Sequence, residues 1–261
     1  MTGKRSGVVA ASAAVLAGLG GLLPMGLGVL MGSVGVGAWF LLWSLVGVAP
    51  WLVGGWFVLR RPRLGTVVLV TSAVFAAPNV VMSLAHAFTG AMGGATSLLP
   101  FQLLMLVAGV AAWIGRPRGG WRGRGGEVPV WLLVPIVLAL TLMWDGPVGG
   151  WLATLASIRS VTEVLAILVP SAVVVIGVIV LFRLRRGAVG AVLLTVAGPM
   201  LFGLLLGVVE GAQRAVSPVV PGGVAALVGS AFLVAVGTLW LLRDDVVMAP
   251  ARAEEQSLPS G

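Results

Sequence analysis

Few side chains in this protein could bind a ligand or move a proton, and eight of them fall near the ends of apolar segments. They are Asn79, His86, Gln102, Asp145, Arg159, Glu163, Glu210 and Arg214. A carboxylate in such a place could hold a cation or relay a proton, and an amide or imidazole could hydrogen-bond a small solute. We treat these eight residues as a candidate polar cluster.

Local pairing is the simpler interpretation of the charged members. Arg159 and Glu163 are four residues apart, as are Glu210 and Arg214. Residues at this spacing lie on one face of a helix and can form ion pairs. Ser160 and Glu163 also match a capping box at a helix start. On this interpretation the charges stabilise helix ends and bind no ligand.

The uncharged members have a similar pair of interpretations. Asn79 follows Pro78, which has no N–H and therefore leaves a backbone carbonyl one turn earlier without its helical partner. Polar groups beside such a break hold substrate in many transporters. The alternative is that Asn79 and Gln102 hydrogen-bond to neighbouring helices.

The composition excludes most catalytic and cofactor chemistry. The absence of cysteine excludes disulfides, thiolate metal sites and lipid-modified cysteine anchors. The single histidine, His86, cannot supply two haem ligands or a His-Glu-x-x-His zinc site, and the only lysine, Lys4, precedes every apolar segment. No phosphate-binding loop or serine-hydrolase motif occurs, and Asp145 lacks a second aspartate within an apolar segment. We expect no catalytic residue, metal or cofactor, with a lipid-handling enzyme as the minor alternative.

The elements that must position these residues are membrane-spanning helices. Hydrophobic residues make up 59% of the 261 residues and charged residues only 9%. A soluble domain is about 45–50% apolar and about 25% charged, so this chain lacks the polar residues to cover an exterior in water. The 39 glycines and 15 prolines are typical of helices that pack closely inside a membrane. The fold class we predict is all-α, a polytopic integral membrane helix bundle.

Apolar runs of about 17–25 residues with few or no charges are long enough to cross a bilayer. Eight runs are near or within that range, at residues 7–23, 37–59, 65–85, 98–115, 129–144, 161–182, 187–209 and 222–242. Every Lys and Arg except Arg159 and Arg214 lies on one side of the resulting topology. Short loops rich in Lys and Arg stay in the cytoplasm, so both termini are expected there.

The chain also shows signs of an internal duplication. Prolines within or beside the runs recur at separations of 120–123 positions, in the order Pro24, Pro50, Pro78 and Pro100, then Pro147, Pro170, Pro199 and Pro221. Arg-Pro-Arg-Leu-Gly at 61–65 likewise matches Arg-Leu-Arg-Arg-Gly at 183–187. We expect two similar four-helix halves in parallel orientation, at residues 1–118 and 129–245. A Gly- and Arg-rich cytoplasmic linker would join them at 119–128, and a disordered cytoplasmic tail would follow at 246–261.

Two classes of function fit this organisation. The first is a transporter or permease-like protein that passes a small solute or ion between the halves. The second is a non-catalytic membrane subunit that organises lipids or a partner complex. A water-accessible cavity between the halves, lined by Asn79, His86, Gln102, Glu163 and Glu210, would favour the first class. A dry interface would favour the second.

The expected partners follow from the topology. Basic residues on the cytoplasmic side attract anionic lipid headgroups, and this topology explains the arginines of the linker without nucleic acid. A membrane protein or a second copy of the chain is the further partner class. The Arg-, Ala- and Gly-rich composition indicates a bacterial cell membrane. Lys4 and Arg5 before the first run also fit a cleaved signal peptide, an alternative that the duplication disfavours.

Overall fold

The computed structural model describes residues 2–30, 37–88, 99–117, 185–213 and 221–248, together with 131, 132, 134–136 and 139. The helices longer than one turn are α1 (Thr2–Leu30), α2 (Gly37–Arg60), α3 (Pro62–Phe88), α4 (Leu99–Ile114), α8 (Arg186–Gln213) and α9 (Pro221–Leu242). A one-turn helix, α10 (Asp245–Met248), follows α9. No strand occurs among the described residues, so the predicted all-helical class is confirmed there.

Six of the eight predicted runs correspond to these long helices, with bounds that differ by a few residues. The largest difference is in α1, which extends seven residues beyond the predicted end at 23. The fifth run is described only at scattered positions, and the sixth lies outside the described residues. Val246, Val247 and Met248 were predicted to begin the tail and instead form α10 with Asp245.

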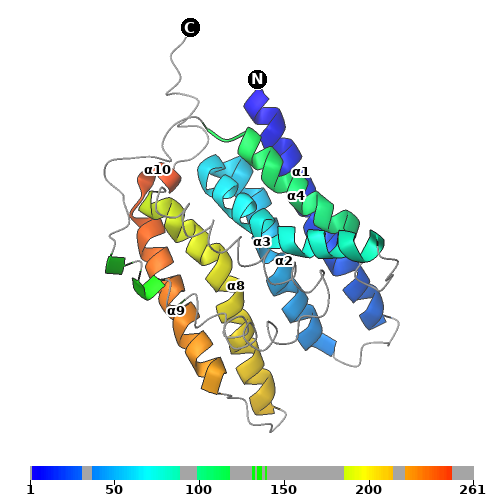
Figure 1. The fold of residues 1–261 in the computed structure, drawn as a ribbon, viewed down its shortest axis with the longest axis vertical. Coiled ribbons are helices and arrows are strands. Elements are labelled where there is room, and N and C mark those ends of the chain that lie inside the picture. The colour runs from blue at the N-terminus through cyan, green and yellow to red at the C-terminus, as the bar shows by residue number, and fades with distance from the viewer. Residues whose placement is uncertain are drawn as a thin grey trace.

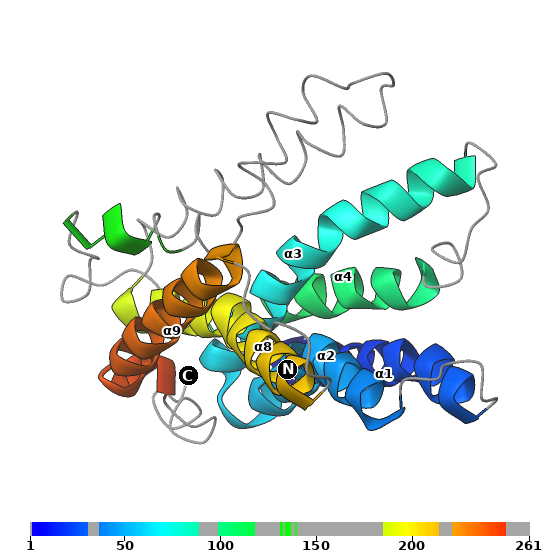
Figure 2. The same cartoon turned by 90° about the horizontal axis from the view of Figure 1, so that it is seen from below.

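The first four helices pack as a ring (Figures 1 and 2). Helix α1 contacts α2 and α4, and α3 contacts the same two helices from the other side. Helices α8 and α9 form a second, antiparallel pair. Helix α8 joins the two groups because it also packs against α2 and α3.

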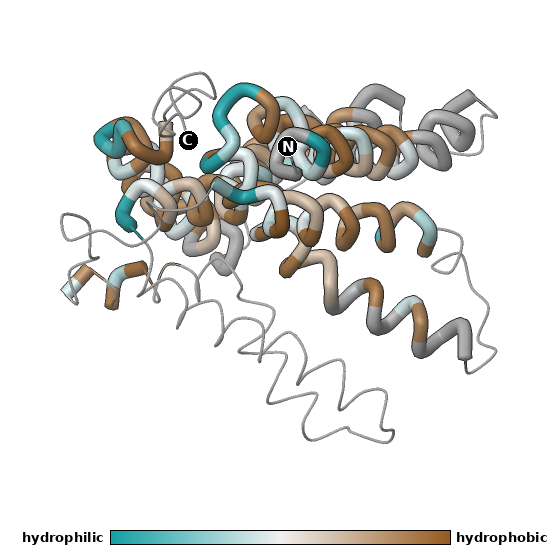
Figure 3. The backbone as a smooth tube through the Cα atoms, turned by 90° about the horizontal axis from the view of Figure 1, so that it is seen from above, coloured by the Kyte–Doolittle hydropathy of each residue, from teal (hydrophilic) through white to brown (hydrophobic). Residues whose placement is uncertain are grey.

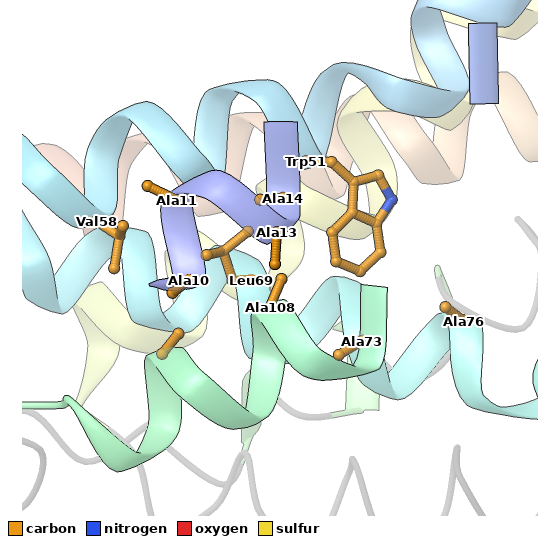
Figure 4. Close-up of a cluster of buried hydrophobic side chains, with 11 residues drawn as sticks. Ala10, Ala11, Ala13, Ala14, Trp51, Val58, Leu69, Ala73, Ala76 and Ala108 are labelled. Carbon is orange, nitrogen blue, oxygen red and sulfur yellow. The ribbon is translucent and has the colours of Figure 1, made fainter. Parts of the chain in front are cut away.

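The interior of the ring consists mainly of small side chains. Its core contains Ala10, Ala11, Ala13 and Ala14 of α1, Ala73 and Ala76 of α3, and Ala108 and Ala112 of α4 around Trp51, Val58 and Leu69 (Figure 4). The outer surface carries large apolar side chains, such as Leu16 of α1, Trp56 of α2 and Val110 of α4, each more than half exposed. Small residues inside and large apolar residues outside are typical of helices that pack in a membrane.

Two further cores hold α8 in place. Val189, Leu193 and Ala197 of α8 pack with Leu233 of α9, and with Ile136 and Ala139 from the region of the predicted fifth run. On the other side, Ala188 and Ala191 of α8 pack with Leu64, Val67 and Val68 of α3 and with Val247 of α10. This second core joins the α8–α9 pair to the ring.

Glycines allow the helices of each group to approach closely. A Cβ atom built at Gly54 of α2 would lie 2.7 Å from Leu69 Cδ2, and one at Gly55 would lie 3.3 Å from the carbonyl oxygen of Ala11. Between α8 and α9, a Cβ at Gly190 would lie 2.5 Å from the carbonyl oxygen of Gly237. A Cβ at Gly190 would overlap backbone atoms, so glycine sets the spacing of α8 and α9 there. At Gly54 and Gly55, glycine lets α2 lie close to its neighbours.

One end of the bundle carries the positive charge of the described residues (Figure 3). Helices α1, α3 and α8 begin there and α2, α4 and α9 end there, next to α10. All described Lys and Arg residues lie at or beside these helix ends, at Lys4, Arg5, Arg60, Arg61, Arg63, Arg116, Arg185, Arg186 and Arg243. We call this the basic end.

Length and composition identify two described helical segments as able to cross a membrane, Arg5–Leu22 in α1 and Arg186–Val209 in α8. Shorter apolar helical stretches are Ser44–Arg60, Pro62–Ala77, Leu99–Ile114 and Ala226–Leu242. A core helix of a soluble protein, or a signal sequence near the N-terminus, passes the same test of length and composition.

Candidate functional site

An apolar cleft lies between α2 and α8. Its volume is about 610 Å³, within the roughly 300–1,000 Å³ range of ligand pockets. One wall is formed by α2 residues from Leu42 to Phe57, and the facing wall by α8 residues from Ala191 to Phe202. The cleft therefore lies between the ring of α1–α4 and the α8–α9 pair.

The cleft is long enough for a hydrocarbon chain. From Leu42 to Phe57, α2 rises by about 22 Å at 1.5 Å per residue. One leaflet of a bilayer contributes about 15 Å of hydrocarbon, half of the usual 30 Å. A chain that entered at one end would therefore remain within the cleft over a full leaflet.

Helix-interior prolines shape both walls. Pro50 of α2 and Pro199 of α8 line the cleft and have no N–H to donate to the carbonyls of Val46 and Thr195, four residues earlier. Thr195 is the only described lining residue with a polar side chain, and its hydroxyl donates to the carbonyl of Ala191 at 2.7 Å. The described lining thus offers a solute almost no free polar side-chain group.

The cleft reaches the basic end, where Leu64 of α3, Leu241 of α9 and Met248 of α10 line it. Arg61 lies beside this mouth, because its Nη1 is 3.3 Å from the sulfur of Met248. Arg63, in the first turn of α3, donates from Nη1 to the carbonyl of Val246 at 3.1 Å. Both arginines therefore join α10 to the start of α3.

Asp244 holds α10 and α8 together at the same end. Its Oδ1 accepts hydrogen bonds from the backbone N–H groups of Val246 at 3.1 Å and Val247 at 3.2 Å, which caps α10. Its Oδ2 accepts from the N–H of Gly187, in the first turn of α8, at 3.3 Å and pairs with Arg185 Nε at 3.3 Å. One carboxylate thus satisfies unpaired donors at the starts of two helices.

The burial of this carboxylate makes its partners important. The side chain of Asp244 is 8% exposed and that of Arg185 is 22% exposed. A buried carboxylate is tolerated only when charge and hydrogen bonds compensate for lost hydration, and here one guanidinium and three backbone N–H groups do so. The arrangement is a structural clamp.

The predicted polar cluster is only partly within the described structure. Asp145, Arg159, Glu163 and Arg214 lie outside the described residues. The structure places the backbone of Asn79 and His86 in α3 and that of Glu210 in α8, and does not describe their side chains. Gln102 is the one member whose side chain is described, and its helix, α4, provides none of the described cleft lining.

Gln102 has an unusual environment. Its Oε1 is buried and has no hydrogen-bond partner within the described part of the chain. Gly109 of α4 lies opposite Ala73 of α3, because a Cβ built at Gly109 would meet Ala73. The two helices are antiparallel, so Gln102, seven residues before Gly109, lies near the level of Val80, seven residues after Ala73. Asn79 is therefore at about the same level on α3, whereas His86 lies about 10 Å farther along that helix.

Sequence reasoning missed the cleft and the clamp. A signal for Asp244 was present, because Asp before a short apolar segment at 246–248 is a typical N-cap. No comparable signal marks the cleft, because its aliphatic residues are of the same types as those expected to face lipid.

Comparison with family models, with curated proteins and with solved structures finds no match to this chain.

Proposed function

We propose that this protein is a multi-pass membrane protein that holds lipid hydrocarbon between its two helix groups and performs no catalysis. The observation that carries the proposal is the long apolar cleft between α2 and α8. A site for a polar solute needs convergent polar groups, and the described lining provides one hydroxyl that is already bonded within α8. A lipid chain needs only a long apolar surface.

The character of the surface supports the membrane location. Large apolar side chains are exposed on all six long helices, including Leu19 of α1, Leu205 of α8 and Leu239 of α9. Water would penalise this surface at about 25 cal/mol per Å², whereas lipid would not. The collection of described basic residues at one end agrees with the positive-inside rule and favours a cytoplasmic location for that end.

The full arrangement that we propose has eight spans in two four-helix halves with both termini in the cytoplasm. The ring of α1–α4 has the size expected of one half. In this arrangement α8 and α9 would be the seventh and eighth spans, the counterparts of α3 and α4 in the other half. The cleft would then lie where the halves meet.

Photolabelling tests whether hydrocarbon occupies the cleft. A phosphatidylcholine with a diazirine on one acyl chain, in bilayers that contain the protein, should label lining residues such as Val53 and Leu194 more strongly than Val107 on the exposed face of α4. Gly198→Phe should fill the cleft and reduce this labelling severalfold, because a side chain there meets nothing within 4 Å and projects from a lining position.

Gly47→Phe is the matched control. Gly47 also has open space around it, but it is exposed on α2 and does not belong to the described lining. Labelling that is uniform over all lipid-facing helices, or that both substitutions reduce equally, would refute hydrocarbon binding in the cleft.

A permease for a small solute or ion is the second candidate function. The buried, unpartnered Oε1 of Gln102, at the level of Asn79, favours it. In that case Glu163→Gln or Glu210→Gln should abolish solute flux or its phenotype at matched expression, because each keeps the shape of the side chain and removes its charge. Asp145→Asn should be the most tolerated change. If all three variants behave like the wild type, carboxylate-coupled transport is wrong. The predicted local pairs of Glu163 with Arg159 and of Glu210 with Arg214 would then account for these two carboxylates, at about 0.3–0.5 kcal/mol per pair.

A further inference from the structure

The mouth of the cleft at the basic end combines an apolar entrance with positive charge. Leu64, Leu241 and Met248 line the cleft there, and Arg61 Nη1 lies 3.3 Å from the sulfur of Met248. A molecule whose chain occupied the cleft would therefore place its polar end beside Arg61.

The charge around this mouth is strongly unbalanced. The described helix ends that meet there carry six arginines, Arg60, Arg61, Arg63, Arg185, Arg186 and Arg243, and two aspartates, Asp244 and Asp245. Of the two carboxylates, that of Asp244 already pairs with Arg185 and accepts hydrogen bonds from backbone N–H groups. The mouth therefore attracts anions, and Arg guanidinium groups bind phosphate with matched, paired hydrogen bonds.

Trp56, near the mouth of the cleft, indicates the depth of the membrane–water interface. Trp56 of α2 is 56% exposed, and the guanidinium of Arg60 lies 5.9 Å from the centre of its ring. Trp prefers the headgroup level of a bilayer, where its ring is partly apolar and partly hydrated. The cleft mouth, lined at the next residue by Phe57, would then open at the depth of the lipid phosphates.

We propose that the cleft binds an anionic phospholipid of the cytoplasmic leaflet, with an acyl chain between α2 and α8 and its phosphate at Arg60 and Arg61. This inference rests on the proposed function, because it needs hydrocarbon in the cleft. It adds the class of lipid and the residues that select it. Basic pockets between membrane helices on the cytoplasmic side are suited to such headgroups, and each basic residue near the surface contributes about 1 kcal/mol.

The test uses the full chain in bilayers and two diazirine lipids with the same acyl chains, phosphatidylglycerol and phosphatidylcholine. The anionic lipid should label cleft residues more strongly. The double variant Arg60→Gln and Arg61→Gln should reduce this preference by about fivefold per arginine, the equivalent of about 1 kcal/mol each. Labelling by phosphatidylcholine should fall much less, because its choline cation offsets the charge of its phosphate and weakens the attraction to the arginines.

Arg116→Gln is the matched control. Arg116 also lies at the basic end, but it follows α4, where its guanidinium is 3.9 Å from the centre of the Trp113 ring. Equal labelling of the cleft by the two lipids would overturn the headgroup site and leave hydrocarbon binding intact. A loss of preference of about fivefold in Arg116→Gln, equal to the expected loss per arginine in the double variant, would also overturn it. Absence of cleft labelling by either lipid would overturn the proposed function itself.

Discussion

Substitution of Gly190 is expected to disrupt the packing of α8 on α9. An alanine Cβ at this position would lie 2.5 Å from the carbonyl oxygen of Gly237, 3.0 Å from the backbone nitrogen of Leu241 and 3.2 Å from Trp240 Cβ. Two of these atoms belong to the backbone and cannot rotate away, so the helices must separate. Overpacking of this kind costs about 1–3 kcal/mol, and Gly190→Leu should prevent folding to a monodisperse protein. The unfolding temperature in detergent measures the effect of Gly190→Ala. Size-exclusion chromatography shows whether Gly190→Leu is monodisperse.

Another glycine of the same helix, Gly198, provides the control. A Cβ at Gly198 meets nothing within 4 Å, so Gly198→Ala should unfold at the temperature of the wild type or slightly higher, since alanine favours the helix. If Gly190→Ala and Gly198→Ala had the same unfolding temperature, the close approach of α8 and α9 would be wrong.

The helices themselves were predictable because their limits depend on local features of the sequence. Helix α2 was predicted at residues 37–59 and ends at Arg60, where the apolar run meets charged residues. Helix α3 begins at Pro62. Proline lacks an N–H, and an N–H in the first turn of a helix has no partner within the helix, so proline costs no hydrogen bond there. Runs of apolar residues between such signals indicate helices without knowledge of their neighbours.

Which helices would be neighbours was less predictable. The predicted duplication would relate Pro50 to Pro170 and Pro78 to Pro199, but the cleft brings together Pro50 and Pro199, which that prediction does not make equivalent. Contacts between helices depend on small residues such as Gly54 and Gly190, and in a chain with 39 glycines these positions do not stand out. The sequence therefore predicted a site of scarce polar residues, whereas the cleft in the structure is lined by apolar residues.

Substitution of Asp244 is expected to destabilise the starts of two helices, α8 and α10. Asp244→Ala removes the acceptor for Val246 and Val247 in α10 and the acceptor for Gly187 in α8. Loss of an N-cap costs about 0.5–2 kcal/mol for each helix start. Arg185 would also lose the carboxylate that lies 3.3 Å from its Nε. We therefore expect a lower unfolding temperature and release of α10 from the mouth of the cleft.

Hydrogen exchange at three backbone amides separates this clamp from a general loss of stability. The amides of Gly187, Val246 and Val247 should exchange about 2–30-fold faster in Asp244→Ala, the equilibrium equivalent of a lost N-cap. Asp244→Asn should retain part of the protection, because an amide oxygen still caps a helix while the ion pair is lost. Asp245→Ala is the control, since Asp245 is exposed and accepts none of these bonds. If Asp245→Ala accelerated exchange at the same three amides as much as Asp244→Ala, the carboxylate of Asp244 would not be what joins α8 and α10.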